Sequence, residues 1–263
     1  MRMSVIDWIR RISELDKRKF AFLSGFFYSL IGVLAAIIIF PNDVGLMSVA
    51  FTSMLSIPPL ILLLKKTVKK NAALKKFSLS IIFKNHSDIF VVYIFLFLGI
   101  FLSYLMISLF LSPSLLLKYF SVQLNIVSGI KSNVLINIIS NNLLVFVISF
   151  LLSFIFGAGG VLFLIWNASV WGVVLSFFLK DSLANGQILL FLINLVSILP
   201  HLITEATAYI GAAIVGGIVS KAILLEKLFS RPFNQIVTQG AIFLIIGALL
   251  VVLAAIIEAT IFF

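Results

Sequence analysis

The sequence contains no cysteine, and this absence removes several kinds of chemistry. Disulfide bonds, thiolate metal sites and a cysteine nucleophile are all excluded. Charged residues are also scarce, at 11% of the chain, whereas hydrophobic residues make up 62% of it. Such a composition lies outside the range of soluble globular proteins and is typical of a chain that crosses a membrane several times.

Histidine and the signatures of familiar catalytic sites are rare as well. The chain has two histidines, His86 and His201, and neither belongs to the zinc-binding motif H-E-x-x-H. The sequence has no G-x-S-x-G nucleophile elbow and no phosphate-binding P-loop. We therefore expect a protein that is not an enzyme and that needs no cofactor or metal ion.

Apolar runs of about 20 residues, long enough to cross a bilayer, recur along the chain. The first covers 20–40 and the second 44–64, and we expect these two to form a hairpin. A third covers 89–111, with Asp88 as its expected N-cap. Residues 141–179 are too long for one crossing at ~1.5 Å per residue, so the sequence predicts two spans joined at "GAGG".

The remaining apolar segments complete an all-α, polytopic membrane fold with about seven spans. A helix over 200–220 and a last apolar segment over 241–263 are each long enough to cross once. Pro200 is expected in the first turn of its helix, where its missing N–H is harmless. The shorter run over 187–199 therefore predicts one broken or re-entrant element near 187–200.

The positive charges predict the orientation of the chain. They cluster within 1–19, 65–84 and 221–231. Since Lys and Arg favour the cytoplasmic side of a membrane, all three clusters are expected inside. This places the N-terminus in the cytoplasm of a multi-pass protein of the cell membrane, with a basic cytoplasmic loop over 65–88 and an outer loop over 112–140.

Two of the basic segments are expected to lie at the membrane surface, beside a single transmembrane domain over 20–263. Residues 1–19 carry apolar residues at helical spacing, which indicates an amphipathic helix, lying in the interface or packed on the protein itself. The segment 65–84 has seven lysines and no acid, which favours anionic lipid headgroups over nucleic acid. The lysines expected at the headgroups are Lys65, Lys66, Lys69, Lys70, Lys75 and Lys76.

Polar residues within the spans carry most of the functional information. Asn141 and Asn142 open one predicted span, and Asn167 lies within the next. His201 and Glu205 are four residues apart, which places them on one face of a helix. Because an acid inside a membrane marks a functional site by default, these five residues form the predicted intramembrane polar site.

Two further groups of residues in the spans are expected to have simpler roles. Glu258 lies close to the end of the last span, so we expect its side chain to reach the headgroups. Glycines let helix backbones approach closely in a membrane. The glycines predicted to pack helices in this way are Gly157, Gly159, Gly160, Gly172, Gly211, Gly216 and Gly217.

Two segments together resemble a known family. They are "NNLLVFVISFLLSFIFGAGGVLFLIWNASVWG" and "LPHLITEATAYIGAAIVGG". They combine paired asparagines at the head of a span, a glycine-rich segment, a further asparagine, and Pro-His followed by Glu and a helix of small residues. This pattern resembles the stage II sporulation protein M family of integral membrane proteins of bacteria and archaea. Family members typically have glycine where this chain has Ala168 and Leu202.

The resemblance implies a role in organising other proteins. In spore-forming bacteria, the named member belongs to a membrane complex that directs peptidoglycan-degrading partners during engulfment, and it acts as an anchor or scaffold. We accordingly expect a non-catalytic scaffold whose partners are membrane or envelope proteins or further copies of itself. A transporter or permease subunit with its site at His201 and Glu205 is the alternative. A third hypothesis is an intramembrane enzyme that uses this pair.

Overall fold

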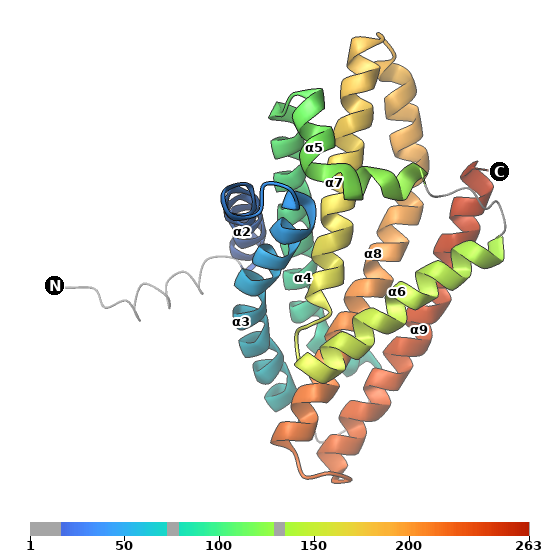
Figure 1. Ribbon diagram of the computed structural model, residues 1–263. Helices are drawn as coiled ribbons and strands as arrows, with labels where there is room; N and C mark the ends of the chain where they lie inside the picture. Colours follow the sequence, from blue (N-terminus) through green and yellow to red (C-terminus); the bar gives the residue numbers. More distant parts are fainter. Residues whose placement is uncertain (1–16, 73–78, 129–134, 263) are drawn as a thin grey trace.

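The computed structural model describes residues 17–72, 79–128 and 135–262, and these residues form helices joined by short turns (Figure 1). The predicted all-α fold is confirmed. The predicted amphipathic helix over 1–19 lies outside the described residues except for its last three. The helices are α2 (Lys17–Ile39), α3 (Val44–Ala72), α4 (Leu79–Phe110), α5 (Pro113–Ser128), α6 (Leu135–Phe156), α7 (Val161–Ala184), α8 (Ile188–Leu225) and α9 (Arg231–Phe262).

Within the described ranges, seven helices are long and apolar enough to cross a bilayer. They are all of the helices except α5, so the predicted number of spans is confirmed. The two spans predicted within 141–179 are α6 and α7, and the turn between them contains "GAGG". Helix α5 has 16 residues, is interrupted at Phe120, and is bound to α3 by the amide of Gln123, which donates to the carbonyl of Gly45 at 3.0 Å.

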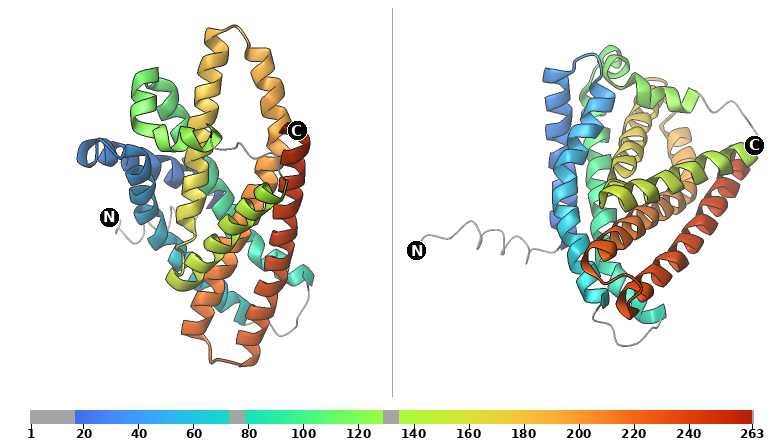
Figure 2. Two further views of the ribbon diagram at one scale, coloured as in Figure 1. Left: turned by 45° about the vertical axis from the view of Figure 1, so that its right-hand side comes forward. Right: turned by 60° about the horizontal axis from the view of Figure 1, so that its bottom comes forward.

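The helices form two packed groups that meet along α7 and α8 (Figures 1 and 2). In the first group, α2 packs on α3 and α4, and α4 packs on α7. In the second, α8 packs between α6 and α9. Small residues allow the closest of these contacts: a methyl group on Gly25 would collide with the carbonyl of Leu96, and one on Gly99 with the carbonyl of Phe22.

The predicted cytoplasmic loop over 65–88 is largely helical, so this prediction was wrong about its structure. Helix α3 continues to Ala72 and α4 already begins at Leu79. Asp88 therefore lies inside α4 and is not an N-cap; its carboxylate lies 3.5 Å from the ammonium of Lys17 and 3.9 Å from that of Lys70. Lysine is a good helix former, and a helix that continues beyond the hydrocarbon keeps its backbone hydrogen bonds.

The predicted outer loop over 112–140 also contains more helix than expected. It includes α5 and the first turns of α6, which begins at Leu135. Asn141 and Asn142 therefore lie inside α6 and do not open the span. The polar residues of this segment lowered its hydropathy, although they do not prevent a helix from forming where it reaches water.

The predicted break near 187–200 does not exist, because α8 runs without interruption from Ile188 to Leu225. Pro200 lies inside this helix and not in its first turn. A proline in a helix removes one backbone hydrogen bond. A broken helix would leave several backbone groups unpaired in hydrocarbon, where water cannot reach them, so continuing through Pro200 costs less.

The described parts of the basic segments lie at the same end of the molecule. The ion pairs of Asp88 with Lys17 and Lys70 join the beginning of α2, the end of α3 and the first part of α4. The turn between α8 and α9, which contains Lys227, lies at this same end (right view of Figure 2). This arrangement is the one that the predicted topology requires, while the side of the membrane on which this end lies stays a prediction.

Candidate functional site

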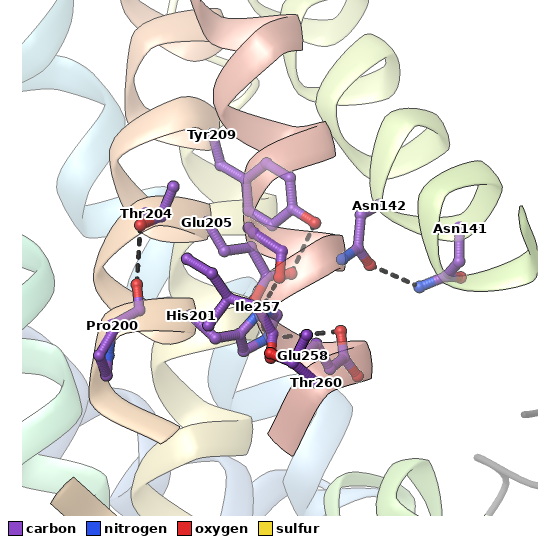
Figure 3. A network of polar contacts seen from close by, with 11 residues as sticks. Asn141, Asn142, Pro200, His201, Thr204, Glu205, Tyr209, Ile257, Glu258 and Thr260 are labelled. Carbon is purple, nitrogen blue, oxygen red and sulfur yellow. Dashed lines mark hydrogen bonds and ion pairs between the residues drawn. The ribbon is translucent and has the colours of Figure 1, made fainter. Parts of the chain in front are cut away.

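Three titratable side chains meet where α8 packs against α9 (Figure 3). The Nε2 atom of His201 lies 3.3 Å from Oε2 of Glu205, which is one turn further along α8. The same Nε2 atom lies 3.6 Å from Oε2 of Glu258 on α9. The side chains of His201, Glu205 and Glu258 are 7%, 11% and 13% exposed, so the group is nearly closed to its surroundings. We refer to these three residues with Tyr209 as the polar cluster.

Tyr209 completes the polar cluster from the next turn of α8. Its hydroxyl donates a hydrogen bond to Oε1 of Glu205 at 2.6 Å. Since His201, Glu205 and Tyr209 follow one another at intervals of four residues, the helix stacks them along one face. The carboxylate of Glu205 thus has a partner for each of its oxygens, namely the tyrosine hydroxyl and the histidine ring.

The other ring nitrogen of His201, Nδ1, contacts the backbone of α9. Nδ1 lies 3.0 Å from the backbone carbonyl of Ala254, which can only accept a hydrogen bond, so Nδ1 carries a proton. Nε2 then faces the carboxylates of Glu205 and Glu258. A hydrogen bond there requires one further proton, either on the ring or on one of the carboxyl groups. Nε2 thus has Glu205 of its own helix within hydrogen-bonding reach at 3.3 Å and makes an ion-pair contact with Glu258 of α9 at 3.6 Å.

Asn142 approaches the cluster from α6 (Figure 3). It is 5% exposed, and its side-chain oxygen accepts a hydrogen bond from the amide of Asn141 at 3.2 Å. Its side-chain nitrogen is buried and acts on the carboxyl group of Glu258. Asn142 thus brings a hydrogen-bond donor from a third helix, α6, to the polar cluster.

The five predicted polar residues are brought together only in part. The structure gathers Asn142, His201 and Glu205, and Asn141 reaches them through Asn142. Asn167 instead donates to the carbonyl of Phe163 at 2.8 Å, within its own helix α7. Its side chain therefore satisfies the backbone of α7.

Glu258 and Tyr209 belong to the polar cluster although neither is among the five predicted polar residues. Glu258 does not extend toward the headgroups but turns to His201, because α9 lies along α8 and places its last turns beside the first half of that helix. No spacing in the sequence shows which spans pack together. Tyr209 was detectable, since it continues the interval of four from His201 and Glu205 along an apolar helix.

The predicted packing glycines lie in three kinds of surroundings. Gly157 has a φ of +78°, in the left-handed region, and opens the turn after α6. Gly211 is buried, but a methyl group there would meet only the ring of Phe90, at an ordinary contact distance of 3.5 Å. At the others, a methyl group would collide with a backbone carbonyl: these are Gly159, Gly160, Gly172, Gly216 and Gly217.

The predicted headgroup lysines lie at the end of α3 as far as the structure describes them. Lys65, Lys66, Lys69 and Lys70 are exposed in the last turns of that helix. Lys75 and Lys76 lie outside the described residues. Lys70 has Asp88 as an ion-pair partner, so its charge is partly balanced by the protein.

A cavity of about 480 Å³ lies elsewhere, on a different face of α8. Residues of α4, α7 and α8 line it, and no member of the polar cluster is among them.

Over the described residues, no group of three or more His, Cys, Asp or Glu side chains is arranged to hold a metal ion.

Comparison with known proteins gives a family match. The family model for stage II sporulation protein M matches residues 89–261, which extend from the first third of α4 to the last turn of α9 and include the whole polar cluster. No curated protein matches the chain, and no solved structure matches it.

Proposed function

The chain belongs to the stage II sporulation protein M family, and from this membership we propose that it is a non-catalytic scaffold or anchor that organises partner proteins in the membrane. Its seven apolar helices make it a multi-pass membrane protein. The partners of a scaffold of this kind are membrane or envelope proteins or further copies of the chain. Its exposed lysines at the end of α3 would contact anionic headgroups on the cytoplasmic side.

The closed state of the polar cluster is the observation that supports this proposal most. A transport site has to exchange its ion or substrate with water, and such sites line cavities. Here the three titratable side chains are at most 13% exposed, and none of them lines the 480 Å³ cavity. A closed group of matched donors and acceptors instead fixes α8 against α9 in one arrangement.

A fixed arrangement is useful to a protein that presents surfaces to partners. The first turns of α8 carry a row of exposed apolar side chains, with Leu189 at 69%, Ile193 at 54% and Val196 at 66% exposed. The polar cluster begins just after this row and holds the same helix against α9. We infer that the cluster sets the position of the exposed part of α8, where a partner helix would bind.

The substitution Glu205→Gln tests this role because it keeps the shape of the side chain and removes its charge. Thr204→Val is the matched control, since Thr204 precedes Glu205 and its hydroxyl bonds to the carbonyl of Pro200 in its own helix at 2.7 Å. Both variants and the wild type are purified from native membranes in mild detergent after chemical crosslinking. We expect Glu205→Gln to insert normally but to retain much less of the partner, while Thr204→Val retains as much as the wild type.

The transporter hypothesis predicts a different result in the same variants. The wild type is reconstituted into vesicles that contain a pH-sensitive dye, and proton entry is followed after a pH step. For a scaffold, we expect no more proton entry than in empty vesicles. Proton entry that depends on Glu205, together with unchanged partner recovery in Glu205→Gln, would replace the scaffold by a transporter.

A further inference from the structure

The cavity lined by α4, α7 and α8 is an apolar groove within the membrane-spanning helices. It is bounded by α4 from Ile94 to Leu105, by α7 from Trp171 to Leu179 and by α8 from Phe191 to Ile210. The hydroxyl of Thr207, which also lines it, donates to the carbonyl of Ile203 at 2.7 Å and so has no need of water. We call this cavity the apolar groove.

The groove lies between membrane-spanning helices, so we expect hydrocarbon to fill it. A groove with an apolar lining does not hold water stably. If it were empty, its lining would lose dispersion contacts on one side. Along α4 the groove extends for 12 residues, roughly 17 Å at ~1.5 Å per residue, which is about half of the ~30 Å hydrocarbon core of a bilayer. Its length thus corresponds to one leaflet.

The volume of the groove suits a small, flexible occupant. The groove holds about 480 Å³, within the range of roughly 300–1,000 Å³ that is typical of small-molecule sites. A single flexible acyl chain is an occupant of this kind.

A lysine lies at the end of the groove where Leu105 and Leu179 line it. Lys180 follows Leu179, and its ammonium donates to the carbonyl of Ser108 at 2.7 Å and to that of Leu111. An ammonium has three N–H donors, so one remains for a further acceptor. The neighbouring carboxylate of Asp181 accepts a hydrogen bond from the amide of Asn185 at 3.1 Å.

We propose that the apolar groove binds a phospholipid, with one acyl chain between α4, α7 and α8 and its phosphate at the ammonium of Lys180. The lysine is positioned by the carbonyls at the end of α4, so it presents its charge at a fixed point. This site is separate from the polar cluster and does not depend on the proposed scaffold function. It also lies at the other end of α4 from the exposed lysines of α3.

Native mass spectrometry of the protein purified in mild detergent tests the proposal. We expect the wild type to retain one phospholipid per chain. Ala206→Phe fills the groove from α8 and should abolish retention. Val196→Phe is the matched control, because it adds a phenyl ring to the same helix at a site that is 66% exposed and outside the groove, and it should retain lipid like the wild type.

Lys180→Met tests the headgroup contact without filling the groove. Loss of a charge-assisted hydrogen bond should weaken retention about tenfold in a titration with added phospholipid. If Ala206→Phe fails to fold, as judged by size-exclusion chromatography, Lys180→Met decides the question alone. Unchanged retention in Lys180→Met, or a wild type that carries no lipid, would overturn the proposal.

The other conceivable occupants give distinguishable results. Excess inorganic phosphate should leave the bound lipid in place, because the acyl chain supplies most of the contact. The chain has no native cysteine, so Leu195→Cys gives a single thiol in the groove. We expect no disulfide-linked dimer on oxidation in vesicles; such dimers, together with absence of lipid, would show that a second copy fills the groove.

Discussion

His201 connects α8 to α9 through both of its ring nitrogens. Nδ1 binds the carbonyl of Ala254 and Nε2 faces Glu205 and Glu258, so the ring cannot turn without losing contacts to both helices. Breaking a buried ion pair by removing one partner is costly, because it leaves the other charge without compensation. Each acid of the cluster should therefore matter to stability, although each is distant from water.

Glu258→Gln provides the residue-scale test, because the sequence alone placed this side chain at the headgroups. If Glu258 shares the proton of His201, Glu258→Gln should lower the free energy of unfolding by about 1–3 kcal/mol. The measurement is thermal or denaturant unfolding of the purified protein in detergent. Combined with Glu205→Gln in a double-mutant cycle, it should give a coupling energy of about 0.5–3 kcal/mol. Additive effects would show that the two carboxylates do not share a partner.

The sequence identified part of the site for a clear physical reason. His201 and Glu205 are close in the chain, so helical spacing alone places them together. Glu258 comes from another helix, and the choice among packing partners depends on three-dimensional contacts that no local pattern encodes. Asn167 was misjudged as a cluster residue because an asparagine in a span can equally bond to its own helix, as its contact with Phe163 shows.

At the scale of the elements, hydropathy predicted the spans but not where several helices end. The hydrocarbon core requires an apolar run with paired backbone groups, which leaves a strong signal in the sequence. Outside the core, a helix can continue through lysines or asparagines, as α3 does to Ala72 and α6 does from Leu135. The same requirement for paired backbone groups explains why α8 passes through Pro200.

Pro200→Ala tests the continuity of α8. In an unbroken helix, alanine restores the backbone N–H and removes the clash of the ring, which is worth up to ~3 kcal/mol in a helix interior. We therefore expect a higher unfolding temperature than that of the wild type in the same detergent. A first-turn proline has no such cost, so an unchanged or lower unfolding temperature would indicate that a new helix starts there.

Gly216 and Gly211 form a matched pair on α8. A methyl group on Gly216 would collide with the carbonyl of Phe150 and lie 2.8 Å from Cβ of Ser153, both on α6. Gly216→Ala should therefore push α6 and α8 apart and destabilise the protein by about 1–3 kcal/mol. Gly211→Ala has room beside Phe90 and should be neutral or stabilising by up to about 1 kcal/mol through helix propensity.

Unfolding of the two alanine variants in one detergent separates packing from propensity. Both substitutions add the same methyl group to the same helix, so any general effect of alanine is common to them. Equal stability of Gly216→Ala and Gly211→Ala would contradict the close approach of α6 and α8.

At the scale of the whole molecule, the two ends of the helix bundle differ in charge. The described parts of the basic segments lie at the end with the α8–α9 turn, and the α7–α8 turn lies at the other end of α8. Positive charge favours the cytoplasm. This rule predicts that the end with the α8–α9 turn lies in the cytoplasm and that the α7–α8 turn lies outside.

Single cysteines test the orientation, since the chain has none of its own. Gln187→Cys places a thiol in the α7–α8 turn and Lys227→Cys places one in the α8–α9 turn, both at exposed positions. In intact cells, a membrane-impermeant maleimide should label Gln187→Cys and should label Lys227→Cys only after permeabilisation. The reverse pattern would invert the topology and move the basic segments to the outer side.

We propose that this member of the stage II sporulation protein M family organises partners and does not act alone. Affinity purification of the tagged wild-type protein from its native membrane in mild detergent, with the recovered proteins quantified by mass spectrometry, tests it most directly. We expect a partner to be recovered reproducibly in a fixed ratio to the chain, and to be lost in Glu205→Gln but not in Thr204→Val. Repeated recovery of the folded protein by itself would contradict it.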